Sequence, residues 1–322
     1  MKDRINIGII GFGTVGTGVV RILNQNSSLI ERRLGIPVRI KGIADIDTKR
    51  DRGVKIEEGI LTDNPLSLIG SPEVDIVVEL IGGIEPAKTL ILAALGKGKS
   101  VVTANKALLA LHGEEIYSAS ETNSVEIGFE GAVGGGIPII RSLKEGLVAN
   151  KIESIYGIIN GTSNYILTKM TDEGMGFSEA LQNAQSKGYA ETDPTLDIEG
   201  IDSAHKLVIL ATLAFGTPVN FNNIYTEGIS KITPLDIDFA REFGYKIKLL
   251  AIAKLMNDEI ELRVHPTMVP EDYLISKVNG VFNAIYVIGD ALGSAMFYGR
   301  GAGEMPTASA VLSDIIEISR NI

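Results

Sequence analysis

The feature that most constrains this chain is a glycine-rich turn near its N-terminus. In INIGIIGFGTVGTGVVRIL, residues 5–23, an apolar β-branched run leads through three spaced glycines into a helical pattern. A G-x-G-x-x-G turn between a strand and a helix lets the backbone approach a pyrophosphate, which the helix N-terminus stabilises. The stretch therefore predicts a nucleotide-binding βαβ unit, with an ordinary strand-to-helix turn as the weaker alternative. We assign to cofactor binding Gly11, Phe12, Gly13, Thr14, Val15 and Gly16.

A second strand pattern, PVRIKGIADID, carries Ala44 and Asp45 at its end. A carboxylate in this position accepts the ribose 2′-hydroxyl of NAD and repels the 2′-phosphate of NADP. Lys49 and Arg50 follow closely, however, and could hold that phosphate. The sequence therefore favours NAD weakly and leaves NADP open.

Two further strands are expected within 75–83 and 100–106, each followed by a helical pattern. Ligands of open α/β sheets bind at the carboxyl ends of the strands, which places Leu80, Gly82 and Thr103 beside the cofactor. Lys106 begins a helix, where its charge opposes the helix dipole, so we expect it to have a functional role. The C-terminal stretch GRGAGEMPTASAV is expected to return here and to close one side of the cofactor cleft with Gly303.

This alternation predicts an α/β protein with an N-terminal Rossmann-type, doubly wound parallel sheet and a second α+β domain. We expect residues 1–135 and 300–322 to form the dinucleotide-binding domain. Residues 136–299 would form the substrate-binding and dimerisation domain. The last third alternates strands and polar turns, with a hairpin at 257–259, and its open sheet could pair across a dimer.

Composition excludes several classes of function. The 40 acidic residues outnumber 30 Lys and Arg, giving a net charge of −10, which argues against nucleic-acid and membrane partners. There is no cysteine, so thiol nucleophiles and thiolate metal sites are excluded, and three scattered histidines do not predict a metal site. The longest strongly apolar stretch, near 207–215, is too short to span a bilayer, and we find no signal peptide. We therefore expect a cytoplasmic protein.

The middle of the chain contains two ambiguous stretches. VEIGFEGAVGGGIPIIRSL offers Glu130 and freed backbone carbonyls, which suit a cation, although its spacing alone favours a plain hinge. In KIESIYGIINGTSNYILTKM, Thr162 or Ser163 is the expected N-cap of a helix from about Asn164. That helix end could bind a carboxylate or simply be capped.

A third stretch, GYAETDPTLDIEGIDSAHK, gathers five carboxylates before a lysine. Residues 188–196 read as a loop, and a helix is expected from about Asp197 or Ile198. Asp202 and Lys206 then lie four residues apart on one helix face. As a surface pair they would contribute only about 0.3–0.5 kcal/mol. A solvated face is the ordinary interpretation; beside a substrate, the same pair could relay a proton.

Six motifs in order resemble those of homoserine dehydrogenases: GFGTVG, TANKALL, EGAVGGGIP, GIINGTSNYIL, GYAETDPTLDIEGIDSAHK and GRGAGEMPTASAV. The resemblance spans essentially the whole chain, and the GYAE block is highly specific. It implies reversible NAD(P)-dependent interconversion of L-homoserine and L-aspartate 4-semialdehyde, in threonine, methionine and isoleucine biosynthesis. It also implies a homodimer, without settling whether that dimer goes on to a tetramer.

The resemblance also implies residue roles. Lys206 would be the acid–base residue at the C4 oxygen, Lys106 would polarise that oxygen, and Asp202 would assist the proton relay. The substrate would be bound by Glu191, Asp197, Tyr189, Gly161 and Thr162. A monovalent cation, usually sodium in this family, would be held by the Glu130 side chain and the carbonyls of Val133, Gly135 and Ile137. The resemblance thus favours a cation site over the plain hinge that the spacing alone favoured.

Many members of that family continue into a regulatory ACT domain, whereas this chain stops at Ile322. We therefore expect a short form without threonine feedback through such a domain. Three rival interpretations are an oxidoreductase for another hydroxy acid, an NAD-sensing DNA regulator and a cofactor-bound scaffold. The first does not need the GYAE block, and the net charge disfavours the second. The scaffold would tolerate loss of Lys206.

Overall fold

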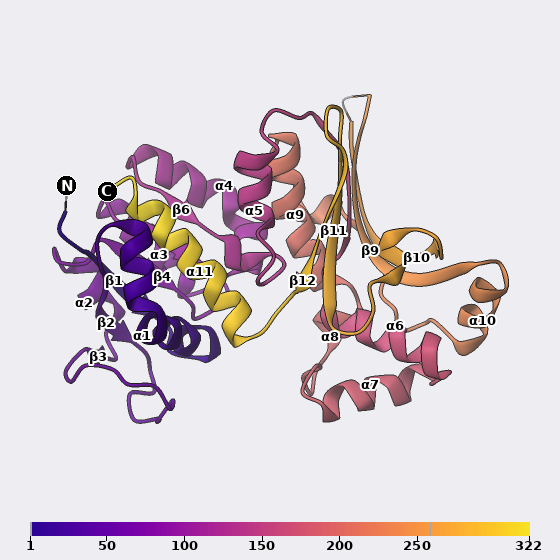
Figure 1. Ribbon diagram of the computed structural model, residues 1–322, viewed down its shortest axis with the longest axis horizontal. Helices are drawn as coiled ribbons and strands as arrows, with labels where there is room; N and C mark the ends of the chain where they lie inside the picture. The colour runs from indigo at the N-terminus through magenta and orange to yellow at the C-terminus, as the bar shows by residue number, and fades with distance from the viewer. Residues whose placement is uncertain (1, 258) are drawn as a thin grey trace. The chain divides into compact units, whose positions relative to one another are not determined.

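The computed structural model describes residues 2–257 and 259–322 and divides the chain into two compact units (Figure 1). The first unit comprises the residues up to Gly136 together with Ala302–Ile322. The second unit is Ile137–Gly301. Each unit is built around a six-stranded sheet.

The sheet of the first unit is entirely parallel, in the order β3-β2-β1-β4-β5-β6. Its strands are β1 (Ile5–Ile10), β2 (Val38–Ala44), β3 (Leu61–Thr62), β4 (Ile76–Glu79), β5 (Ser100–Thr103) and β6 (Ile127–Gly128). This is the strand order of a Rossmann sheet, with the topological switch between β1 and β4. The predicted fold class is confirmed. The reason is visible in the sequence, because β1, β4 and β5 are nearly continuous apolar runs that become buried on both faces.

Helices cover this sheet: α1 (Thr14–Leu34), α2 (Pro65–Gly70), α3 (Ala87–Gly96), α4 (Lys106–Thr122) and α11 (Glu304–Ser319), with a short 3₁₀ turn η1 (Glu130–Ala132). The C-terminal α11 lies beside α1, as the yellow and indigo ribbons show in Figure 1. The approach is close: a Cβ on Gly18 would stand 2.8 Å from the carbonyl of Glu304. An ion pair of 2.9 Å between Arg21 and Glu304 joins the same two helices.

The sheet of the second unit has the order β12-β11-β7-β9-β10-β8. Its strands are β7 (Ile152–Ile158), β8 (Tyr225–Thr226), β9 (Tyr245–Met256), β10 (Glu259–Pro270), β11 (Phe282–Gly289) and β12 (Gly293–Arg300). Among the described residues, neighbouring strands of this sheet are antiparallel, except that β8 runs parallel to β10. Met256 pairs with Glu259 across the expected hairpin, while Asp258 of that turn lies outside the described residues.

The helical segments of this unit are α5 (Ile139–Arg141), the π turn η2 (Ser142–Gly146), α6 (Gly161–Glu173), α7 (Phe177–Ser186), α8 (Thr195–Ile198), α9 (Ile201–Phe215), η3 (Phe221–Asn223), α10 (Pro234–Glu242) and η4 (Leu274–Lys277). Two stretches of the last third whose patterns predict strands, residues 219–228 and 273–289, form shorter strands than predicted. The Asn220 side chain accepts from the N–H of Asn222 and turns 221–223 into a 3₁₀ helix, leaving only β8. Gly280, at φ 64°, separates η4 from β11.

The helix expected from about Asp197 is also different. Gly200 adopts φ 80°, which side-chain-bearing residues rarely adopt, so α8 ends before it and α9 begins after it. Asp202 and Lys206 nevertheless remain together on α9.

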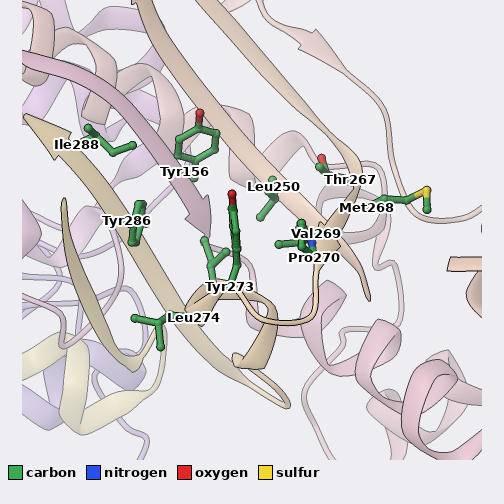
Figure 2. Close-up of a pocket in the computed structure, with 11 residues that line it drawn as sticks. Tyr156, Leu250, Thr267, Met268, Val269, Pro270, Tyr273, Leu274, Tyr286 and Ile288 are labelled. Carbon is green, nitrogen blue, oxygen red and sulfur yellow. The ribbon is translucent and has the colours of Figure 1, made fainter. Parts of the chain in front are cut away.

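One face of the second sheet carries a pocket of about 500 Å³. Tyr156 of β7 pairs with Tyr286 of β11, and both rings face this pocket together with Leu250, Tyr273 and Leu274 (Figure 2). Among the described residues, no helix is both long and apolar enough to cross a membrane.

Candidate active site

The glycines of the glycine-rich turn have two different roles. Gly11 has φ 103° and donates its N–H to the carbonyl of Ala44, 2.8 Å away. A Cβ on Gly16 would stand 2.2 Å from the Gly11 carbonyl, so both positions serve the turn itself. A Cβ on Gly13, by contrast, would meet nothing within 4 Å. Gly13 and Thr14 are exposed at the N-terminus of a 21-residue helix, a geometry that fits a dinucleotide pyrophosphate.

Asp45 directly follows β2 and is tied to that turn. Its Oδ2 accepts from the N–H of Phe12 at 2.6 Å, and its Oδ1 accepts from the N–H of Asp47 at 2.8 Å. Oδ1 also pairs with Arg52 at 3.0 Å. Our sequence reasoning missed Arg52, because it considered only Lys49 and Arg50, whose residues are exposed here.

Two residues that the sequence analysis overlooked brace the ends of β4 and β5. Glu79 is fully buried, and its carboxylate accepts from the N–H groups of Ile81 and Gly82 at 2.8 and 3.1 Å and from the Thr103 hydroxyl at 2.6 Å. This fixes the loop that contains Leu80 and Gly82. Asn105 caps α4 by accepting from Leu108 N–H at 3.2 Å, and Lys106 is the half-buried first residue of that helix. Asparagine before a helical run is the signal that would have identified the cap.

The Glu130 segment is a buried turn. Glu130 is 4% exposed, and its N–H donates to Asp314 Oδ2 at 2.7 Å. Val133 and Ile137 are buried, and Gly135 has φ 56°. One buried carboxylate together with the backbone carbonyls of a turn is a set of oxygen donors that fits a hard cation. In residues 2–257 and 259–322, no group of three or more His, Asp or Glu is arranged to hold a metal ion by side chains alone.

In the second unit, α6 begins one turn earlier than expected. The N-cap is Asn160, whose Oδ1 accepts from the N–H of Ser163 at 2.8 Å, so the prediction of Thr162 or Ser163 as the cap was wrong. Asparagine is among the best N-caps, and its backbone here is extended, as a cap requires. Thr162 instead donates its hydroxyl to the carbonyl of Tyr189 at 2.7 Å. Gly161 is the first helical residue, where a Cβ would stand 2.8 Å from the Val281 carbonyl.

Asp202 and Lys206 form a buried pair. Lys206 Nζ donates to Asp202 Oδ2 at 2.6 Å and to the carbonyl of Ile159 at 2.7 Å. The two residues are only 6% and 8% exposed. The solvated helix face that the spacing alone favoured is therefore wrong. An exposed i,i+4 pair needs no further partners, whereas Lys206 is also held by the carbonyl of Ile159, which directly follows β7.

Asn160 joins this pair to a second carboxylate. Its Nδ2 donates to Asp202 Oδ2 at 2.8 Å and to Asp197 Oδ1 at 2.7 Å. Burial raises the pKa of the Asp197 carboxyl, and the charge of Asp202 adds to this, while the Asn160 hydrogen bond and Lys206 oppose it. We call Asn160, Asp197, Asp202 and Lys206 the lysine–carboxylate cluster.

The remaining acids of the stretch lie apart from that cluster. Asp193 accepts from the N–H and hydroxyl of Thr195 and so shapes the loop. Glu191 is exposed, and its carbonyl accepts from Gln185. Tyr189 is 44% exposed, with its ring edge-on to Tyr165 at 5.0 Å. The structure thus brings Asp197, Asp202 and Lys206 together and leaves Glu191 and Tyr189 at exposed positions.

A Rossmann sheet with an open pyrophosphate cradle, together with a buried lysine held by a carboxylate and a backbone carbonyl, defines a class of protein: a nicotinamide-dependent oxidoreductase. Comparison with known proteins agrees with this class. The model of the homoserine dehydrogenase family matches residues 138–316, and that of the homoserine dehydrogenase NAD-binding domain matches residues 11–130. This chain belongs to the homoserine dehydrogenase family.

A homoserine dehydrogenase of Helicobacter pylori is 52% identical over 320 residues, covering 99% of this chain and 75% of the relative. The crystal structure of a homoserine dehydrogenase from Thiobacillus denitrificans superposes with a TM-score of 0.95 at 51% identity, covering 98% of this chain and 73% of that one. A hyperthermophilic archaeal homoserine dehydrogenase in complex with NADPH gives a TM-score of 0.83 at 28% identity, covering 99% and 98%.

Proposed function

We propose that this chain interconverts L-aspartate 4-semialdehyde and L-homoserine, using NAD or NADP, in threonine, methionine and isoleucine biosynthesis. The observation that carries the residue assignments is the lysine–carboxylate cluster, in which the buried Lys206 contacts the buried Asp202 at 2.6 Å. When bound, the dinucleotide supplies or accepts the hydride at C4 of the substrate. The protein must then bind an amino acid and move one proton.

Lys206 is assigned the proton transfer. In the reductive direction its ammonium donates a proton to the oxygen that becomes negative as hydride reaches the aldehyde carbon, giving the alcohol. Asp202 holds the ammonium in place and passes a replacement proton from water. In the oxidative direction the neutral lysine accepts the hydroxyl proton. Lys106 is assigned a second positive charge on the same oxygen, on the strength of the family resemblance alone.

The substrate's own charges match the remaining groups. Asp197 pairs with the ammonium group, with Glu191 and Tyr189 contributing from their exposed positions. The N-terminus of α6, at Gly161 and Thr162, offers N–H groups to the substrate carboxylate. The Glu130 turn would hold a monovalent cation, with sodium our choice. For the dinucleotide, Asp45 after β2 supports a weak preference for NAD.

The assembly and location are also proposals. The apolar pocket face of the second sheet, with Tyr273 and Leu274 each 60% exposed, supports a homodimer formed through this face. We place the enzyme in the cytoplasm, where free amino acids and nicotinamide dinucleotides meet.

Initial rates test the reaction. With L-homoserine and either NAD or NADP, reduced nicotinamide should accumulate and be detected by its absorbance. The matched control is 4-hydroxybutyrate, which keeps the C4 alcohol but lacks the ammonium group. With this analogue, the Asp197 carboxylate has no ammonium group to pair with. The value of kcat/KM should therefore be at least about 10²-fold lower than for L-homoserine. Absence of turnover with L-homoserine and both cofactors would refute the proposed function.

A further inference from the structure

A single arginine ties the loop after β2 to the glycine-rich turn. Arg52 donates from Nε to the Phe12 carbonyl at 2.5 Å and from Nη1 to the Arg50 carbonyl at 2.8 Å. Its Nη2 donates to Asp45 Oδ1 at 3.0 Å and to the Asp47 carbonyl at 2.8 Å. The guanidinium also lies over the Phe12 ring, 4.7 Å from its centroid. We call this arrangement the Arg52 clamp.

The clamp changes what Asp45 presents to a ligand. The side chains of Arg52 and Asp45 are 7% and 13% exposed, so little solvent screens their pair. A bare carboxylate here would repel a ribose 2′-phosphate, whereas a carboxylate paired with a guanidinium repels it far less. Asp45 still has Oδ2, held by a single N–H from Phe12, as an acceptor for a 2′-hydroxyl.

We propose that Arg52 sets the balance between NAD and NADP in this chain, and that it does so by neutralising Asp45 rather than by gripping the 2′-phosphate. The inference rests on the proposed function only through its cofactor. A guanidinium has five N–H groups, and four hydrogen bonds of Arg52 already go to the protein. Arg52 is therefore a positioning residue. Lys49 and Arg50 are exposed, and they contact Asp47 through their backbone N–H groups.

The test measures dissociation constants of NADH and NADPH by nicotinamide fluorescence, without any amino-acid substrate. In Arg52→Gln, the ratio Kd(NADPH)/Kd(NADH) should rise about tenfold, because the negative charge of Asp45 is then no longer compensated. Arg52→Lys keeps the charge and should hold the ratio within about twofold of wild type. Asp45→Asn should lower the ratio. In the Asp45→Asn background, adding Arg52→Gln should raise it by a similar factor, because the two charges act additively on the 2′-phosphate.

Each alternative gives a different result. If Arg52→Gln raises the dissociation constants of NADH and NADPH by the same factor, the Arg52 clamp has only a structural role and the proposal is overturned. A rise of the ratio in Arg52→Lys as large as that in Arg52→Gln would mean that the guanidinium fork binds the phosphate directly, which also overturns it. So would Lys49→Gln or Arg50→Gln shifting the ratio as much. If Arg52→Gln fails to fold by circular dichroism, Arg52→Lys and Asp45→Asn decide. Failure of homoserine turnover leaves these binding constants measurable, so the two proposals fail separately.

Discussion

A lysine and an aspartate that are both buried pay a desolvation cost that a surface pair avoids. Lys206 and Asp202 meet it with additional partners, since the Ile159 carbonyl accepts from the lysine and the Asn160 amide donates to the aspartate. Removing either charged partner would leave the other buried and uncompensated. The contrast is Lys169 and Glu173 on α6, an i,i+4 pair of the same chemistry whose side chains are more exposed. Burial, not spacing, distinguishes the pair to which we assign the proton transfer from the ordinary one.

A second buried lysine makes stability depend on pH. Lys248 is 2% exposed, and burial, with a smaller contribution from Lys246, lowers the pKa of its ammonium to about 8 from 10.5. Between these values the unfolded chain binds the proton more tightly, so this group favours the folded state increasingly as pH rises from 8 to 10.5. The free energy of unfolding of wild type, minus that of Lys248→Met, should rise by at most about 3 kcal/mol over that range. Urea unfolding at several pH values measures it, and a difference that is flat with pH would contradict the prediction.

At the scale of elements, the glycine-rich turn separates folding from binding. Gly16→Ala should destabilise the folded state, because its methyl would stand 2.2 Å from the Gly11 carbonyl. Gly13→Ala should fold normally, because its methyl meets nothing within 4 Å, but should bind dinucleotide at least about tenfold more weakly by filling the pyrophosphate cradle. Thermal unfolding and NADH titration of both variants check this pair. Full cofactor affinity in Gly13→Ala would place the pyrophosphate elsewhere.

Local patterns predicted β1, α1, β2, β4 and β5, because strand runs and glycine turns are encoded by neighbours in sequence. The same reasoning gave Asp202 and Lys206 a shared helix face. It failed where contacts are distant: Asn160 reaches Asp197 and Asp202 across 37 and 42 positions, and Arg52 reaches Phe12 across 40. It also failed at Gly200, where a left-handed backbone interrupts an apparently continuous helical pattern. The burial of Asp202 and Lys206 follows from the packing of α9 against the end of β7. No local sequence pattern indicates that packing.

At the scale of the whole molecule, the proposed homodimer has a direct test. Leu274 on the pocket face of the second sheet and Leu66 on α2 are similarly exposed, at 60% and 59%. Leu274→Asp should convert the dimer to a monomer near the chain mass of 34.4 kDa, because it places a charge in the apolar interface. Leu66→Asp should leave the dimer intact. Light scattering coupled to size exclusion gives both masses, and an unchanged mass for Leu274→Asp would move the interface away from this face.

The measurement that tests the central claim most directly is turnover of L-homoserine by Lys206→Ala, followed by reduced-nicotinamide absorbance, with NADH affinity measured in parallel. We predict that kcat falls by about 10²–10⁴-fold while the dinucleotide binds as in wild type. Lys169→Ala, which removes the lysine of the more exposed i,i+4 pair on α6, should retain full turnover. Turnover by Lys206→Ala close to that of wild type would contradict the account and assign the proton transfer to Lys106 or to water.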